Sequence, residues 1–122
     1  MTELTIEDFC AKIVAFRTKD RRMTMKMMVE FDINADIIEV PECVVKDREI
    51  LRRRFLKWLY NKSVKHKYWV NFPDGSRGVC YRSDAFVEWL NKKRLKDYPE
   101  KAMVLEQEVD SDASRHLPSI FF

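Results

Sequence analysis

Apolar and polar positions alternate most clearly on either side of the chain's only two glycines, Gly75 and Gly78. Residues at every second position of a strand share one face, so this alternation predicts two short strands. The run Pro73-Asp74-Gly75 between them is a strong turn signal, because glycine adopts the positive φ that a tight reversal needs. The sequence therefore predicts a β-hairpin over residues 68–82. One face of its first strand is expected to carry Tyr68, Val70 and Phe72.

The hairpin is flanked by two segments with helical periodicity. A long helix is expected from about Asp47, after a connector at Pro41–Val45, and Ser83 is well placed to cap a second helix. Each has an apolar stripe at the spacing of a buried helix face. The stripe of the first is Leu51, Phe55, Trp58 and Leu59, and that of the second is Phe86, Val87, Trp89 and Leu90.

Shorter helices are expected upstream of this core. Thr5 is a candidate cap for a first helix, whose apolar stripe ends at Phe16. Thr24 is a candidate cap for a second, short helix over MKMMVEF. A further short helix is expected from Ala35, ending before Pro41 because proline disfavours a helical conformation of its predecessor. The clustered methionines are expected to fill core space, with an adaptable binding surface as the alternative.

Residues 102–122 form an acidic, polar run with an apolar tip. The tip is expected to fold back over the core, with docking on a partner as the alternative. Its candidate partner-binding residues are Leu117, Ile120, Phe121 and Phe122. The predicted organisation is one globular domain, residues 1–101, followed by this tail. The expected fold class is α+β, mainly helical with one β-hairpin.

Composition adds a sharp charge partition to this picture. The 122-residue chain carries 23 Lys/Arg and 20 Asp/Glu. Residues 46–101 hold 16 Lys/Arg against 7 Asp/Glu, a net of +9, and each flank has a net of −3. Such a block predicts a polyanionic partner. The exposed side of the long helix is expected to carry Lys46, Arg53, Lys57 and Tyr60, flanked by Arg52; a merely solvated face is the alternative.

The residues give no indication of catalysis, a metal or a cofactor. No nucleophile has a visible base, and there is no glycine-rich phosphate loop. The three cysteines, Cys10, Cys43 and Cys80, are widely spaced among apolar neighbours, so they are expected to be buried and reduced. With no signal-peptide pattern or membrane-spanning run, we expect a cytoplasmic, non-enzymatic protein.

The order of expected elements resembles a winged helix-turn-helix domain, over residues 24–96. More locally, the hairpin and following helix resemble excisionase-like winged modules, through Ser83, Asp84, Phe86, Trp89 and Leu90. The resemblance implies binding of double-stranded DNA. The helix at residues 46–61 would enter the major groove with Arg52, Arg53, Lys57 and Tyr60, and the wing would contribute Arg77. Such chains are typical of phage and mobile-element regulators.

Three functional hypotheses follow. The first is a nucleic-acid-binding regulator, most simply of DNA, whose cations neutralise phosphates; they are Arg53, Lys57, Lys65, Lys67, Arg77 and Arg82. The second is a small phage-type inhibitor or adaptor that binds a host protein of nucleic-acid processing or defence. In the third, residues 117–121 resemble the short apolar peptides that dock on the bacterial sliding clamp.

Overall fold

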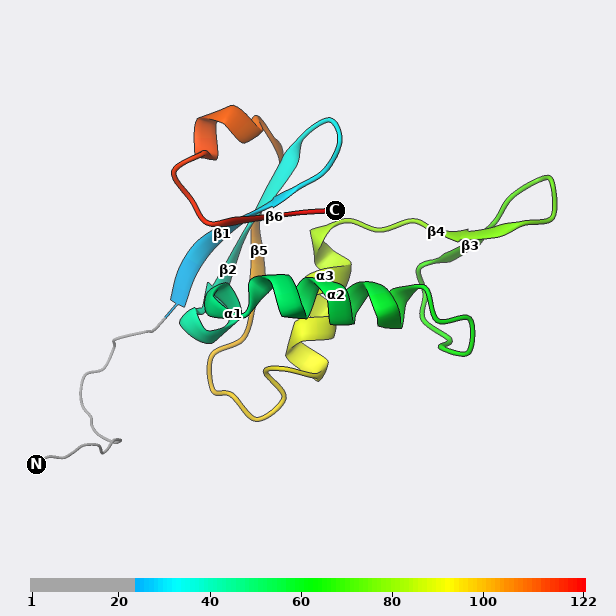
Figure 1. The fold of residues 1–122 in the computed structure, drawn as a ribbon, viewed down its shortest axis with the longest axis horizontal. Helices are drawn as coiled ribbons and strands as arrows, with labels where there is room; N and C mark the ends of the chain where they lie inside the picture. Colours follow the sequence, from blue (N-terminus) through cyan, green and yellow to red (C-terminus); the bar gives the residue numbers. More distant parts are fainter. Residues whose placement is uncertain (1–23) are drawn as a thin grey trace, which may run out of the picture.

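The computed structural model describes residues 24–122. A four-stranded sheet lies at one end, two helices cross beside it, and a two-stranded hairpin projects at the other end (Figure 1). The described chain is about 31% helical and 30% strand. In chain order the elements are β1 (Thr24–Glu30), β2 (Ala35–Pro41), α1 (Glu42–Lys46), α2 (Arg48–Leu59), β3 (Trp69–Asn71), β4 (Arg77–Val79), α3 (Ser83–Lys92), β5 (Met103–Val109), the 3-10 helix η2 (Ser111–Ser114) and β6 (Ser119–Phe121).

The sheet joins segments that are far apart in the sequence. Its strand order is β5-β2-β1-β6. Strand β2 pairs antiparallel with both β1 and β5, and β6 pairs parallel with β1, with Ile120 opposite Val29. Residues 102–122, which the sequence set apart as a tail, thus supply both edge strands.

The expected helices at Thr24 and Ala35 are wrong: both segments are strands, joined by a tight turn in which the Phe31 amide donates to Asn34 O at 2.8 Å. The reason is burial on both faces of the sheet. Met27, Met28 and Val29 are consecutive and all buried, so β1 lacks the polar alternation of a half-exposed strand. The described residues form a small α+β domain that is not mainly helical, so the expected mainly helical, winged-helix-like fold class is wrong.

The two faces of this sheet bury different partners. Val29, Ile38 and Val40 face the helices and join the main core. Met28, Ala35 and Ile37 point the other way and pack against Val109 and Leu117 of the C-terminal segment. The expectation that the methionines fill the core is confirmed for Met27 and Met28. The expectation that the apolar tip folds back is confirmed for Ile120, which is buried in the main core.

The two longer helices are where the sequence predicts them. The core side of α2 buries Leu51, Phe55 and Leu59, and Phe55 is in ring contact with Trp58, Tyr81, Phe86, Trp89 and Phe122. The expected connector at 41–45 is mostly helix α1. Ser83 begins α3 but does not cap it; Arg82 holds the N-cap position.

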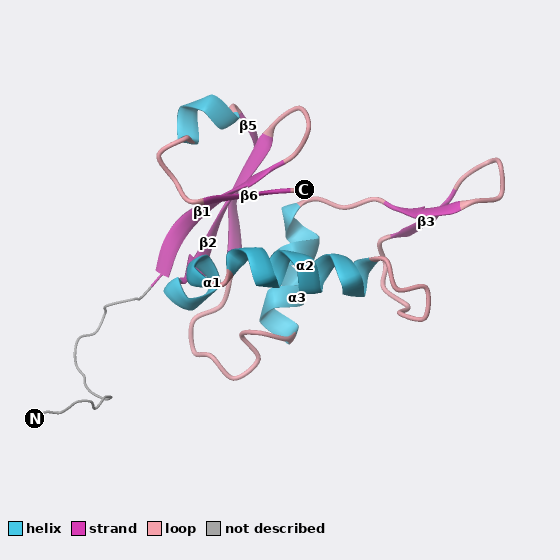
Figure 2. Cartoon of the chain, viewed as in Figure 1, coloured by secondary structure: helices cyan, strands magenta, loops and turns pink. Residues whose placement is uncertain are grey.

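The predicted hairpin is confirmed, with strands shorter than expected (Figure 2). Gly75 has φ +90° at the turn, a conformation that favours glycine. The expectation that the cysteines are buried is wrong for the two described ones: Cys80 is exposed and Cys43 half-buried. Cys10 and the expected helix over residues 5–16 lie outside the described residues. None of the helices in residues 24–122 is long and apolar enough to cross a membrane.

Candidate nucleic-acid interface

A pocket of about 320 Å³ lies where the loop after α2 passes the C-terminal end of α3. We call it the lysine pocket, because Lys65, Lys67, Lys92 and Lys93 all line it. Its remaining lining is mainly apolar and aromatic. These residues are Trp58, Val64, His66, Tyr68 and Trp89, together with the single carboxylate, Glu88. The sequence predicted Lys65 and Lys67 as binding residues, and the structure places them together.

Glu88 engages two of the four lysines. Its carboxylate lies 2.9 Å from Lys92 Nζ and 3.4 Å from Lys67 Nζ, and it accepts a hydrogen bond from the Tyr68 hydroxyl. The Tyr68 bond is the main reason that the pKa of Glu88 falls to about 2, and the Lys92 bond adds to it. Glu88 is therefore ionised at neutral pH. Among residues 24–122, no carboxylate is in ion-pair contact with Lys65 or Lys93.

A stack of planar side chains connects this pocket to the hairpin. The His66 ring lies 4.8 Å from Trp58 and 5.0 Å from Trp69, nearly parallel to the latter. On the hairpin, the Arg77 guanidinium lies 4.4 Å from the centre of the Trp69 ring. The predicted residue Arg77 is therefore held against the same stack, which we call the aromatic stack: Trp58, His66, Trp69 and Arg77.

Hydrogen bonds fix the histidine within this stack. His66 Nε2 lies 2.7 Å from the Leu59 carbonyl oxygen, and His66 Nδ1 lies 3.2 Å from the Tyr68 amide nitrogen. A carbonyl only accepts and an amide only donates, so Nε2 carries the proton and Nδ1 is the acceptor. His66 is thus a structural residue that orders the loop, because both of its ring nitrogens are engaged in hydrogen bonds.

The predicted binding residues of α2 lie on two different flanks of the helix. Arg53 and Lys57 are exposed as predicted, and Arg54 lies one helical turn before Trp58, on the side of the lysine pocket. Arg52 lies on the opposite flank, where its Nε donates to Phe121 O at 2.6 Å. Helix α2 begins at Arg48, after Asp47, so Lys46 belongs to α1 and not to the exposed side of α2.

Tyr60 also lies on the Arg52 side. It contacts Tyr81, whose pKa is raised to about 12 chiefly by burial, and Arg52 is the nearby cation. Arg52 and Tyr60 are therefore separated from the lysine pocket by the width of the helix.

Arg82 is engaged inside the fold. Its Nη2 lies 2.6 Å from Asp36 Oδ1, and Asp36 is fully buried. Burial raises the pKa of the Asp36 carboxyl, but hydrogen bonds from Arg82, Ser83 and the Glu108 amide outweigh it and leave the pKa below its ordinary value. Arg82 thus connects β2 to the start of α3 through Asp36 and is not available to an interface.

The predicted partner-binding residues of the C-terminal segment are largely built into the sheet. Ile120 is buried, Leu117 and Phe122 are half-buried, and only Phe121 is exposed, at 52%. The Phe122 amide donates to Glu30 O at 2.9 Å. A partner that took this segment as a peptide would first have to separate β6 from β1.

Sequence reasoning missed the apolar lining and half of the cations. Trp58 and Trp89 were assigned only to the core, and Lys92 and Lys93 were not among the predicted binding residues. One signal was available: all three tryptophans of the chain, Trp58, Trp69 and Trp89, fall within its basic block, residues 46–101. Their convergence on one pocket depends on how α2, the loop and α3 pack.

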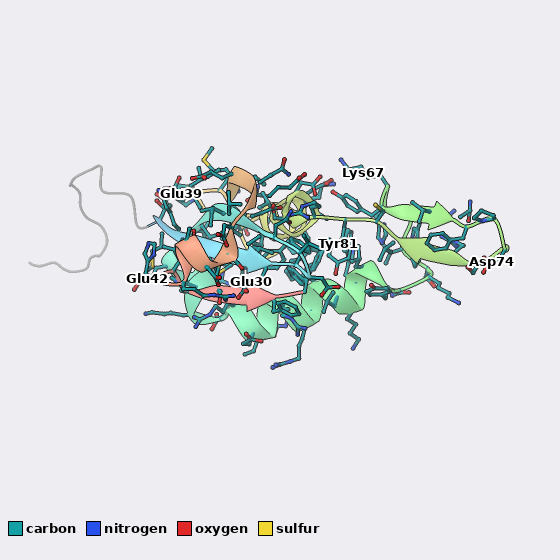
Figure 3. The ribbon with its side chains drawn as sticks, turned by 90° about the horizontal axis from the view of Figure 1, so that it is seen from above. Glu30, Glu39, Glu42, Lys67, Asp74 and Tyr81 are labelled. Carbon is teal, nitrogen blue, oxygen red and sulfur yellow. The ribbon has the colours of Figure 1, made fainter. Side chains whose placement is uncertain are left out.

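Charge follows the long axis of the molecule. Residues 48–96, which form α2, the hairpin and α3, hold 14 Lys/Arg against 4 Asp/Glu. The remaining described residues, mostly of the sheet and its connections, hold 4 against 12. In Figure 3 Glu30, Glu39 and Glu42 lie at the sheet end, whereas Lys67 lies at the base of the projecting hairpin. The acidic end therefore does not cover the basic one.

Within residues 24–122, no cluster of three or more His, Cys, Asp or Glu side chains has the geometry to hold a metal ion. Comparison of the chain with protein-family models, curated proteins and solved structures gives no match.

Proposed function

We propose that this protein binds nucleic acid through the basic end formed by α2, the following loop, the hairpin and the end of α3. One observation carries the proposal. Exposed cations of this end have no ion-pair partner within residues 24–122. They are Arg53, Arg54, Lys57, Lys62, Lys65, Arg77 and Lys93.

The arrangement favours contacts to the phosphate backbone. A surface helix with a purely structural role usually carries interspersed charges of both signs, because these limit non-specific binding. Here the outer side of α2 has three exposed cations within five residues, Arg53, Arg54 and Lys57. Unpaired surface lysines and arginines gain binding energy mainly by releasing counterions from the polyanion.

The proposal does not depend on a winged-helix arrangement. Helix α2 packs through Phe55 against α3 and Phe122, and its exposed side carries cations without the separate reading helix of that family. Backbone binding requires a continuous cationic face and imposes no particular docking geometry.

Salt dependence of binding tests the proposal. We expect fluorescence anisotropy with labelled oligonucleotides to show affinity at low salt that falls steeply as salt is added. The slope of log K against log salt should be about −0.9 per phosphate contacted on duplex DNA. The double variant Arg54→Gln/Lys57→Gln should reduce the magnitude of the slope by about 2, one for each contact.

A matched variant controls for net charge. Lys26 on β1 and Lys46 on α1 are both exposed and lie at the sheet end. Lys26→Gln/Lys46→Gln changes the charge of the protein by the same amount and should leave the slope unchanged. If no nucleic acid is retained at low salt, the proposal is wrong and the protein-partner hypothesis takes its place. Equal losses in both variants would mean that only overall charge matters.

A further inference from the structure

The lysine pocket differs from the rest of the basic end because it is concave and has a mainly apolar lining. Trp58, Val64 and Trp89 are part of this lining, together with four lysines. Binding to the phosphate backbone of a duplex requires cations but no apolar recess. The pocket therefore has a feature that phosphate binding alone does not explain.

The size and lining of the pocket define its occupant. At about 320 Å³ it lies at the low end of the usual range for small-ligand sites. Aromatic side chains that line a groove bind nucleobases of any kind by stacking, and neighbouring cations bind the phosphate. In a duplex the faces of each base are covered by its neighbours, so only an unpaired base can enter such a recess.

The carboxylate of Glu88 does not oppose an anion here. Lys67 and Lys92 both lie against it, so these two lysines neutralise it and hold it in place. Lys65 and Lys93 remain on the lining without a carboxylate partner among the described residues. Lys67 and Lys92 therefore have a structural role in the pocket, whereas Lys65 and Lys93 are available to a ligand.

Resting on the nucleic-acid function proposed above, we infer that the lysine pocket binds one unpaired nucleotide of a nucleic acid strand. The base packs against the apolar lining, and Lys65 and Lys93 bind the phosphate of that nucleotide. The protein accordingly prefers single strands, or duplexes with an unpaired base, to fully paired duplexes.

The tryptophans supply a direct readout. Trp58 and Trp89 line the pocket, and Trp69 stacks on His66 beside it, so all tryptophans of the chain report on its occupancy. In titrations of the full chain, we expect a short single strand to quench tryptophan fluorescence and a blunt duplex of the same sequence to leave it nearly unchanged. Anisotropy should give the single strand about tenfold higher affinity, the value of one stacked base.

Two variants separate stacking from charge. Val64→Trp fills the pocket without changing any charge; the Val64 carbonyl that accepts from Trp69 Nε1 is retained. It should remove the preference for single strands and keep the duplex affinity. Lys65→Gln/Lys93→Gln should weaken single-strand binding more than Lys26→Gln/Lys46→Gln does. Circular dichroism and thermal unfolding establish that each variant is folded.

The outcomes distinguish this inference from the function on which it rests. Equal binding of single strand and duplex, with no quenching, overturns the pocket assignment and leaves backbone binding intact. A preference for single strands that survives in folded Val64→Trp also overturns it. Failure to bind any oligonucleotide overturns both.

Discussion

The two β structures of this protein are held together in opposite ways. The four-stranded sheet pairs strands from the beginning and the end of the described chain, and it buries side chains on both faces. The β3–β4 hairpin is local, exposed and projecting (Figure 1). Two-stranded ribbons are marginal alone, and this one is fixed at its base by the aromatic stack. The comparison indicates that the sheet provides stability, whereas the hairpin presents side chains.

The largest expected effect contrasts two phenylalanines. Phe55 is fully buried among rings from both helices and the C-terminal residue Phe122, and Phe72 on the hairpin is 48% exposed. Phe55→Ala should lower the free energy of unfolding by about 4 kcal/mol, the usual cost of an aromatic truncation in a core. Phe72→Ala should cost less than about 1 kcal/mol. Urea unfolding followed by circular dichroism measures both, and comparable losses would contradict the comparison.

The second prediction concerns the link between the acidic sheet and α3. Asp36→Asn removes the buried charge that pairs with Arg82 and should cost about 3 kcal/mol at neutral pH. Because the folded pKa of Asp36 lies below its unfolded value, its contribution is present above about pH 4 and is lost as pH falls through the folded pKa. The variant should therefore show a flatter decline of stability in acid. An unchanged acid profile in urea titrations would contradict this.

The third prediction tests local anchoring of the hairpin. His66→Ala removes the middle ring of the aromatic stack and two hydrogen bonds, so the hairpin should open locally at a cost of about 1–2 kcal/mol. Hydrogen exchange should accelerate at the hairpin amides of Phe72 and Cys80, which bond to Ser76 O and Tyr68 O. Amides of β1 and β2 should keep their protection. Uniform acceleration would mean that the hairpin and sheet unfold as one unit.

The smallest effect compares two residues with positive φ. Glycine fills that conformation in the hairpin, at Gly75, but the sheet places Glu108 there, with φ 56°. Glu108 adopts it at a bulged end of β5, where its amide donates to Asp36 at 3.0 Å. Glu108→Gly should stabilise by about 0.5 kcal/mol and Gly75→Ala should destabilise by about 1 kcal/mol. Thermal unfolding measures both shifts, and a loss in Glu108→Gly would contradict the strain argument.

The hairpin and the two longer helices could be predicted because their signals are local. Pro73-Asp74-Gly75 specifies the turn, and the 3.6-residue spacing of Leu51, Phe55 and Leu59 specifies the buried side of α2. The strands β1 and β2 could not be recognised in this way. Their apolar residues fill both faces of a sheet, so a run such as Met27-Met28-Val29 has no period that distinguishes it from a helix.

The candidate site shows the same division. That one block of the chain is strongly basic and rich in tryptophan follows from the residues alone, since charge and composition do not depend on folding. Which cations remain available depends on the fold: it pairs Arg82 with Asp36, directs Arg52 to Phe121, and brings Lys65 and Lys93 to one pocket. Ion pairs and pockets form between residues distant in sequence, so the packing of the buried core sets their partners.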